Sequence, residues 1–369
     1  MSECLQWLHY VLNPGRDSIP YVQNWQAVYD FAVKQQIIGC CSPVSYSVRL
    51  DKDVLFKWLG DEQQIRYQNS VVNKRIEELS RILKEAGFRF CILKGQGNAE
   101  MYPDPELRCA GDIDVWIDAD VKSVTGFVRK RYPDIEQTFK HIKFPVFDDV
   151  DVDVHTTPLR LYHPSHEREL EKWIHHQKDK QFAHIIRLSS NGLDVSVPTA
   201  RFNVVYQMGH ILIHLLDEGI GLRHMIDYYY VLQALGRLSE AEKHEIAGEW
   251  QKFGMLRLAS GVMWIEKEIL GLPEASLIVE PNARRGNILL GEMLEGGNFG
   301  HHSSVQRWKG TYFAFRFAKA IHLAKIASLF PGEAMFRLIR KMEIFVGHII
   351  DGRYLMRTSL FYKRKQKQY

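Results

Sequence analysis

Two short segments, in which acidic residues alternate with aliphatic ones, constrain this chain more than any other feature. The first runs from Asp112 to Ile117 and begins Asp-Ile-Asp-Val. Such alternation predicts a β-strand, whose side chains point to opposite faces in turn. Asp112 and Asp114 therefore project from one face, and Ile113 and Val115 from the other.

The second segment, Val150 to His155, repeats this design with Asp151, Asp153 and His155 between valines. If the two strands are neighbours, Asp153 completes a cluster of three carboxylates, and Asp151 on the same face is its rival. His155 would then touch the metal or an acceptor, or orient Asp153. The structural alternative is an exposed edge strand with its acids in water.

Carboxylates that converge in this way repel one another unless a cation lies between them. Mg²⁺ is the expected ion, with Mn²⁺ as a substitute, because it combines one or two protein carboxylates with substrate phosphates. A cluster of three acids can hold two ions and clamp the oxygens of a phosphoryl transfer. The third acid can also accept the proton of the attacking group.

A glycine-containing turn precedes the first acidic strand. The apolar run Phe88–Leu93 predicts a buried strand, and Lys94-Gly95-Gln96-Gly97 follows it. Glycines allow the backbone to approach a phosphate and offer N–H donors to it. Lys94 and Arg108 would neutralise a triphosphate, Arg108 with two hydrogen bonds. A surface charge is the simpler interpretation of each.

Other polar residues have both functional and structural interpretations. His210 and His214 share a helical face and could bind zinc, but without an HExxH glutamate a core or supporting role is favoured. Arg223 could reach a phosphate or an anionic acceptor, although an Arg223–Asp227 helix pair is simpler. Tyr102 could stack on a base, although a core aromatic is the more common role.

The remaining sequence predicts helices on both sides of a small sheet, which is an α+β fold with a mixed sheet. Helical spacing covers most of residues 1–88, including a long pattern that Gly87 ends. Residues 89–198 hold the expected strands. Helical periodicity then returns in five segments of the region 199–369, at residues 202–216, 223–235, 240–252, 257–270 and 305–330.

The charge of the chain bears on whether it binds a polyanion. The net charge of +4 is too small to indicate nucleic acid binding by itself. A basic tail between residues 353 and 367 is either solvated or contacts a polyanion such as RNA or acidic lipid. Its basic residues are Arg353, Arg357, Lys363, Arg364, Lys365 and Lys367.

Location follows from the termini and the cysteines. The five cysteines form no CxxC pair, which argues against a disulfide framework and fits a reducing compartment. The N-terminus does not resemble a signal peptide, and no apolar run approaches the ~18 residues of a membrane span. We therefore expect a cytoplasmic protein without a membrane span.

The order of these features resembles the DNA polymerase β-like nucleotidyltransferase superfamily. A strand comes first, then Lys94-Gly95, then Gly111-Asp112-Ile113-Asp114, and finally a later strand with Asp153. Within it, the run Leu93–Asp118 is similar to an uncharacterised bacterial nucleotidyltransferase family with the pattern LKG…YP…R…DID. That family is related to aminoglycoside and minimal nucleotidyltransferases. The segments Gly219–Asp227 and Gly297–Gly300 extend the resemblance through the helical region.

The resemblance implies metal binding by Asp112 and Asp114, with Asp153 as the third ligand or the base. It also implies a nucleotide-binding role for the turn, carried by Lys94, Gly95, Gln96, Arg108 and Gly111. The chain departs from the superfamily at one position. Gly95 is followed by Gln96, where a glycine or a phosphate-contacting serine is usual, so one hydroxyl contact is missing.

The sequence thus predicts a metal-dependent nucleotidyltransferase that moves an NMP group from an NTP, with ATP expected, and releases pyrophosphate. The acceptor remains open among sugars, small molecules, proteins and nucleic acids. The alternative is a non-catalytic module that binds nucleotide or RNA on the same fold. The expected organisation is a helical region at 1–88, the nucleotidyltransferase core at 89–198, and a helical domain with the basic tail at 199–369.

Overall fold

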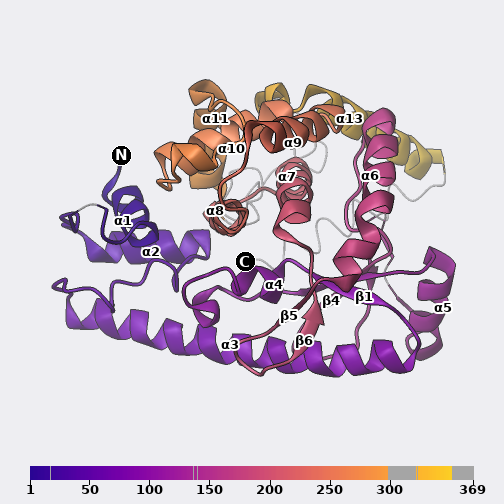
Figure 1. Cartoon of the computed structure of the whole chain (residues 1–369), viewed down its shortest axis with the longest axis horizontal. Coiled ribbons are helices and arrows are strands. Elements are labelled where there is room, and N and C mark those ends of the chain that lie inside the picture. The colour runs from indigo at the N-terminus through magenta and orange to yellow at the C-terminus, as the bar shows by residue number, and fades with distance from the viewer. Residues whose placement is uncertain (17, 136, 139, 298–320, 322, 351–369) are drawn as a thin grey trace.

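The computed structural model describes the chain apart from residues 17, 136, 139, 298–320, 322 and 351–369, and apart from the side chains of 344–350. It confirms the predicted α+β class, because helical regions lie on both sides of a small mixed sheet (Figure 1). The basic tail, residues 298–300 of the family-like segment and most of the helix expected at 305–330 lie outside the described residues.

The main sheet has four strands in the order β1-β2-β4-β3. Strands β2 and β4 pair in parallel, and the two outer pairings are antiparallel. A separate sheet pairs β5 with β6. The sequence predicts β6 but not β5. The bounds are Phe90–Leu93 for β1, Ile113–Ile117 for β2, Ile142–Lys143 for β3, Val152–His155 for β4, Ile185–Arg187 for β5 and Asp194–Ser196 for β6.

Both faces of the main sheet are buried. Ile113 and Val115 pack into a hydrophobic core shared with the long helix α3, Lys52–Glu85. Trp116, on the opposite face of β2, belongs to a second core built largely by the C-terminal helices. Asp114 shares that second face and is only 6% exposed. The alternative of a solvated edge strand is therefore wrong for β2.

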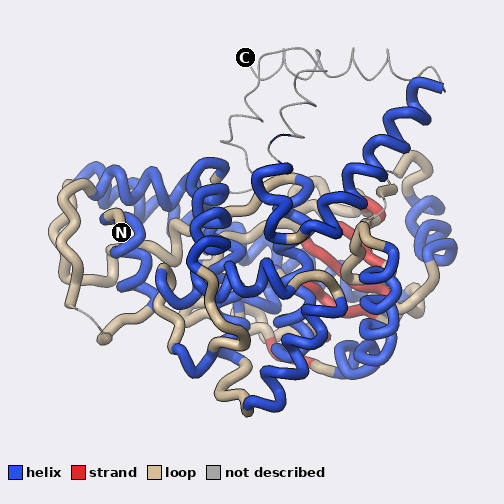
Figure 2. The backbone as a smooth tube through the Cα atoms, turned by 90° about the horizontal axis from the view of Figure 1, so that it is seen from above, coloured by secondary structure: helices blue, strands red, loops and turns tan. Residues whose placement is uncertain are grey.

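Helix α3 covers one side of this sheet. Helix α3 runs along the length of the molecule beneath the strands, as Figure 1 shows. It buries Val72, Ile76 and Leu79 at helical spacing, and Gly87 follows it with a φ of 77°. Helices α1, Glu3–Leu12, and α2, Trp25–Gln35, lie at the opposite end of the molecule from the strands (Figure 2).

The C-terminal helices cover the other side. Helix α7 is apolar on nearly all sides and is almost entirely buried, so it forms the centre of this region. None of the described helices is long and apolar enough to cross a membrane. The bounds are Ala200–Asp217 for α7, Leu222–Ala234 for α8, Glu240–Lys252 for α9, Leu256–Glu268 for α10, Ala283–Gly296 for α11 and Pro331–Ile350 for α13.

Three further helices lie within the expected core region. The short α4, Gly95–Ala99, follows β1, and α5, Val121–Arg131, follows β2. The 20-residue α6, Pro164–Ala183, was not predicted. Its residues are mostly polar, and it buries few apolar side chains, among them Leu170 and Ile174, so the hydrophobic period is weak.

One close backbone contact fixes the N-terminal helices against the core. Gly39 lies in the turn after α2, and a Cβ atom there would stand 2.0 Å from the carbonyl oxygen of Leu107. No side chain fits at that distance, so the packing of the two segments requires glycine.

We expect Gly39→Ala to lower the free energy of unfolding by about 1–3 kcal/mol or more, because the two backbones must separate. The matched control is Gly60→Ala in α3, where a new Cβ meets nothing within 4 Å. That change should instead stabilise by about 0.5–1 kcal/mol through helix propensity. Denaturant titration measures both, and equal stability of Gly39→Ala and the parent protein would contradict the packing described.

Candidate active site

The parallel pairing of β2 and β4 brings the acidic residues together. Asp114 and Asp153 are direct register partners, and Asp112 stands just before β2. Carboxylate oxygens of these three residues lie within 4.8 Å of one another. The expected adjacency of the two strands is therefore confirmed. Asp151 is exposed and does not belong to this group.

Asp114 is buried between two basic side chains. The Lys94 Nζ lies 2.7 Å from its Oδ2, and the His155 Nε2 lies 2.7 Å from its Oδ1. Burial alone would raise the pKa of Asp114, but the Lys94 charge and the His155 hydrogen bond lower it well below its usual range. His155 thus contacts Asp114, whereas one of the alternatives open from the sequence had it orient Asp153.

Asp153 has a basic partner that sequence reasoning missed. The Lys143 Nζ lies 2.7 Å from its Oδ1, and the His141 Nδ1 lies 3.5 Å from its Oδ2. Lys143 reaches this position because it is the register partner of Asp153 in the antiparallel pair β3–β4. The sequence signal that could have identified this partner is that Lys143 lies in the strand expected at residues 142–147. A hairpin joins that strand to the acidic strand.

Asp112 experiences the repulsion that the sequence indicated. The charge of Asp114 is the largest cause that raises the pKa of Asp112, and burial adds to it. A hard divalent cation would relieve this repulsion, and oxygen donors are the ligands it prefers. The three carboxylates therefore fit a divalent metal ion such as Mg²⁺.

The turn after β1 has a strained backbone. Lys94 has a φ of 49°, a conformation that costs a residue with a side chain about 1–3 kcal/mol. Gly95 follows it with a φ of 43°. This backbone aims the Lys94 side chain into the pocket, where Nζ also lies 2.6 Å from the His210 Nε2. Strain retained at such a position is a common mark of a functional site.

The atypical Gln96 has a structural role. Its side chain is buried and donates hydrogen bonds to the side-chain oxygens of Asn69 and Asn73 on α3, at 3.1 Å and 2.8 Å. The amide therefore faces away from the carboxylates and fastens the turn to α3. A nucleotide-binding role for Gln96, which the resemblance implied, would therefore have to use its backbone.

Arg108 is also engaged in the core. Its Nε and Nη2 donate to the two carboxylate oxygens of Asp227, at 2.7 Å and 2.8 Å, and Arg108 is 2% exposed. Tyr102 donates to the same carboxylate and is a core aromatic. The expectation that Arg108 neutralises a triphosphate is therefore not supported. The Arg223–Asp227 helix pair was wrong, because Asp227 pairs with Arg108.

Arg223 remains directed at the pocket. Its Nη1 donates to the Gln36 side chain at 3.0 Å, and its guanidinium packs against Gly111. Burial and the nearby Arg108 lower the pKa of Arg223, so a bound anion would be favourable there.

The three carboxylates, their basic partners and Arg223 line one cavity of about 480 Å³, a size typical of ligand pockets. Lys94, Asp112, Asp114 and Asp153 lie on the sheet side, and His210, His214 and His224 lie on the side of α7 and α8. Burial lowers the pKa of His210 and His224 well below the usual range and so favours the neutral form of both rings.

Comparison with known proteins gives one family. A model of a family described as "Uncharacterised nucleotidyltransferase" matches residues 22–271. A solved structure of an antigenic nucleotidyltransferase-like protein from Paracoccidioides brasiliensis is similar, with 17% identity and a TM-score of 0.31. The similarity covers 50% of this chain and 88% of that one. None of the curated proteins matches the chain.

Neutralising Asp112 and neutralising Asp114 should change the free energy of unfolding in opposite directions. Asp112→Asn should raise the free energy of unfolding at neutral pH without divalent metal, because the raised pKa means that the ionised carboxylate costs stability. This gain should shrink as the pH falls and vanish below about 4, where Asp112 is protonated in both states. Denaturant titration in a chelator, at several pH values, measures it.

Asp114→Asn is the matched comparison and should cost roughly 3–5 kcal/mol, because it leaves Lys94 and His155 beside a neutral amide. Its cost should be present above about pH 4 and be lost at lower pH, since the pKa of Asp114 is lowered by folding. Equal effects of the two substitutions would contradict the charge distribution described.

Proposed function

The chain belongs to the uncharacterised nucleotidyltransferase family, whose model matches residues 22–271, and from this premise we propose a metal-dependent nucleotidyl transfer. An NMP group passes from an NTP to an acceptor hydroxyl, phosphate or amine, and pyrophosphate leaves. The observation that carries the proposal is the register of Asp114 against Asp153, with Asp112 within 4.8 Å, at one pocket.

Asp112, Asp114 and Asp153 would hold Mg²⁺ or Mn²⁺. When bound, such an ion supplies charge neutralisation for the phosphates and aligns the attacking and leaving oxygens. Asp114 and Asp153 come from paired central strands, so their relative position is fixed by backbone hydrogen bonds. This rigidity favours a reaction whose catalysis consists mainly of positioning and electrostatic stabilisation.

The lysines beside the acids have a second role in this proposal. Lys94 and Lys143 now neutralise Asp114 and Asp153, each at 2.7 Å. In a substrate complex the carboxylates would hold the cation instead, and the two ammonium groups would be free to pair with the triphosphate. Arg223 adds a third positive charge from the opposite wall. The positive charges thus stay in the pocket and stabilise the departing pyrophosphate.

The bond changes follow from this arrangement. The acceptor oxygen or nitrogen forms a bond to the α-phosphorus, and the bond from that phosphorus to the bridging oxygen of the β-phosphate breaks. Asp153, or water beside it, takes the acceptor proton. The acceptor enters from the side of α7 and α8, which form the wall opposite the acids. ATP is the first donor to test.

A binding module without turnover is the second candidate. Two observations favour it: the ion pairs that already neutralise Asp114 and Asp153, and the Gln96 side chain directed into α3 instead of the pocket. Such a module would bind NTP without Mg²⁺-dependent release of pyrophosphate. Calorimetry with NTP, with and without Mg²⁺, together with a pyrophosphate assay, separates the two candidates.

Asp112→Asn should reduce nucleotidyl transfer by at least roughly 1000-fold, because it removes a carboxylate of the proposed metal site. The fold should be retained, since the substitution relieves repulsion by Asp114. Each labelled NTP is incubated with the protein, Mg²⁺ and a cell extract, and the labelled acceptor and the released pyrophosphate are quantified.

Asp151→Asn is the control, because Asp151 is exposed and lies outside the cluster. It should leave transfer within about 2-fold of the parent, whereas Asp153→Asn should lose as much as Asp112→Asn. Undiminished transfer by Asp112→Asn would contradict the assignment of Asp112 to the metal site. Loss of transfer by Asp151→Asn alone would mean that the third acid is Asp151.

A further inference from the structure

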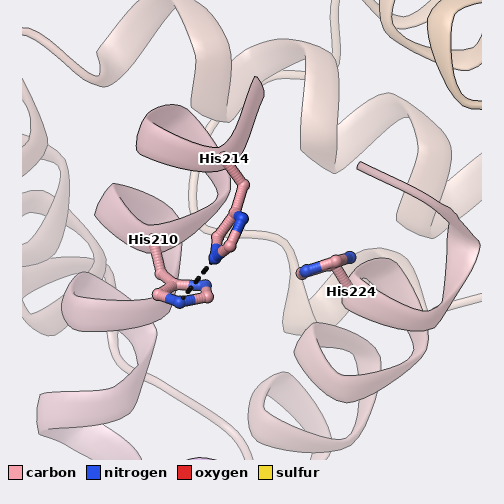
Figure 3. A group of neighbouring side chains, drawn as sticks. All are labelled: His210, His214 and His224. Carbon is pink, nitrogen blue, oxygen red and sulfur yellow. Dashed lines mark hydrogen bonds between the residues drawn. The ribbon is translucent and has the colours of Figure 1, made fainter. Parts of the chain in front are cut away.

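Three histidines converge on the wall of the pocket opposite the carboxylates. His210 and His214 are one turn apart on α7, and His224 comes from the first turn of α8 (Figure 3). One ring nitrogen from each lies within 4.8 Å of the others. The His210 and His214 Nε2 atoms are 3.0 Å apart. Three imidazoles from two helices thus point at one small volume.

The partners of two rings fix which nitrogens carry lone pairs. The His214 Nδ1 lies 3.1 Å from the Glu218 carboxylate, which only accepts, so Nδ1 carries its hydrogen. Its Nε2 is the nitrogen directed at His210. The Lys94 ammonium only donates, so the His210 Nε2 facing it at 2.6 Å carries a lone pair.

The His210 and His214 Nε2 atoms face each other at 3.0 Å. A metal ion at this place would use one nitrogen from each of the three rings. Two nitrogens at the usual ~2.0–2.1 Å from a tetrahedral ion are ~3.3 Å apart, close to the distance seen here.

We propose that His210, His214 and His224 bind a zinc-class transition metal ion at a site separate from the carboxylates. Imidazole nitrogen suits Zn²⁺ and related ions, whereas Mg²⁺ prefers oxygen. Three histidines leave a fourth position for water or substrate, and all three line the pocket. Glu218 holds the His214 ring from behind, as carboxylates commonly do at zinc sites.

This site competes with Lys94. The ammonium of Lys94 occupies the Nε2 lone pair of His210 that the ion would use. Binding of the ion therefore releases Lys94 from His210 and leaves it to Asp114 or to a phosphate. The inference goes beyond nucleotidyl transfer and stands on the imidazole geometry alone. Metal affinity can be measured without any turnover, so failure of one proposal leaves the other intact.

The test titrates full-length, chelator-stripped protein with Zn²⁺ against a chromogenic indicator, in excess Mg²⁺ to occupy the carboxylates. One Zn²⁺ should bind per chain, and Co²⁺ should give the visible absorption of a tetrahedral site. His210→Ala with His214→Ala should weaken Zn²⁺ binding by at least about 100-fold. Glu218→Gln should weaken it by about 10–100-fold.

Lys94→Met is the most discriminating variant, because it should tighten Zn²⁺ binding, by about 10-fold, if the ion and the ammonium compete. The matched control replaces two exposed histidines, His176→Ala with His244→Ala, and should leave affinity unchanged. Circular dichroism reports folding of each variant. If the double α7 variant does not fold, His224→Gln and Glu218→Gln carry the test.

Two results would overturn the proposal. One is that the wild-type protein binds Zn²⁺ no more tightly than the folded histidine variants. The other is that the Zn²⁺ affinity survives loss of the three histidines but falls with Asp112→Asn, which would assign the ion to the carboxylates.

Discussion

The pocket depends on the two polar contacts that the Lys94 ammonium makes. The ammonium lies between the Asp114 carboxylate on β2 and the His210 ring on α7, at 2.7 Å and 2.6 Å, and so joins the sheet to the C-terminal helices. The strained φ of 49° at Lys94 is the cost of aiming this side chain inward. An ionised Asp114 can be buried only because this charge and His155 compensate for lost hydration.

The double-sided burial of the sheet determines which groups can meet. One face of β2 and β4 is aliphatic and packs on α3, so every polar side chain of these strands is directed toward the C-terminal helices. Acids from the sheet and histidines from α7 and α8 therefore share one pocket. The Arg108–Asp227 pair, buried between η1 (Pro105–Leu107) and α8, holds these two layers together without taking part in the proposed chemistry.

Much of the fold could be predicted from the sequence. Strong periodicity located α3 and α10, and alternation located β2 and β4, because these elements bury a continuous face. Weak periodicity concealed α6, whose residues are mostly polar, and β5 has only three residues. The predicted strand at 142–147 is paired only at Ile142 and Lys143, since an apolar run does not by itself specify a hydrogen-bonding partner.

The sequence by itself determined that Asp112 and Asp114 share a face, because strand geometry is local and periodic. It could not choose between Asp151 and Asp153, since that choice depends on the register of β4 against β2. Nor could it pair Arg108 with Asp227, Lys143 with Asp153, or His224 with the α7 histidines. These partners are far apart along the chain or on different elements, and only tertiary packing sets the distances at which their charges and lone pairs interact.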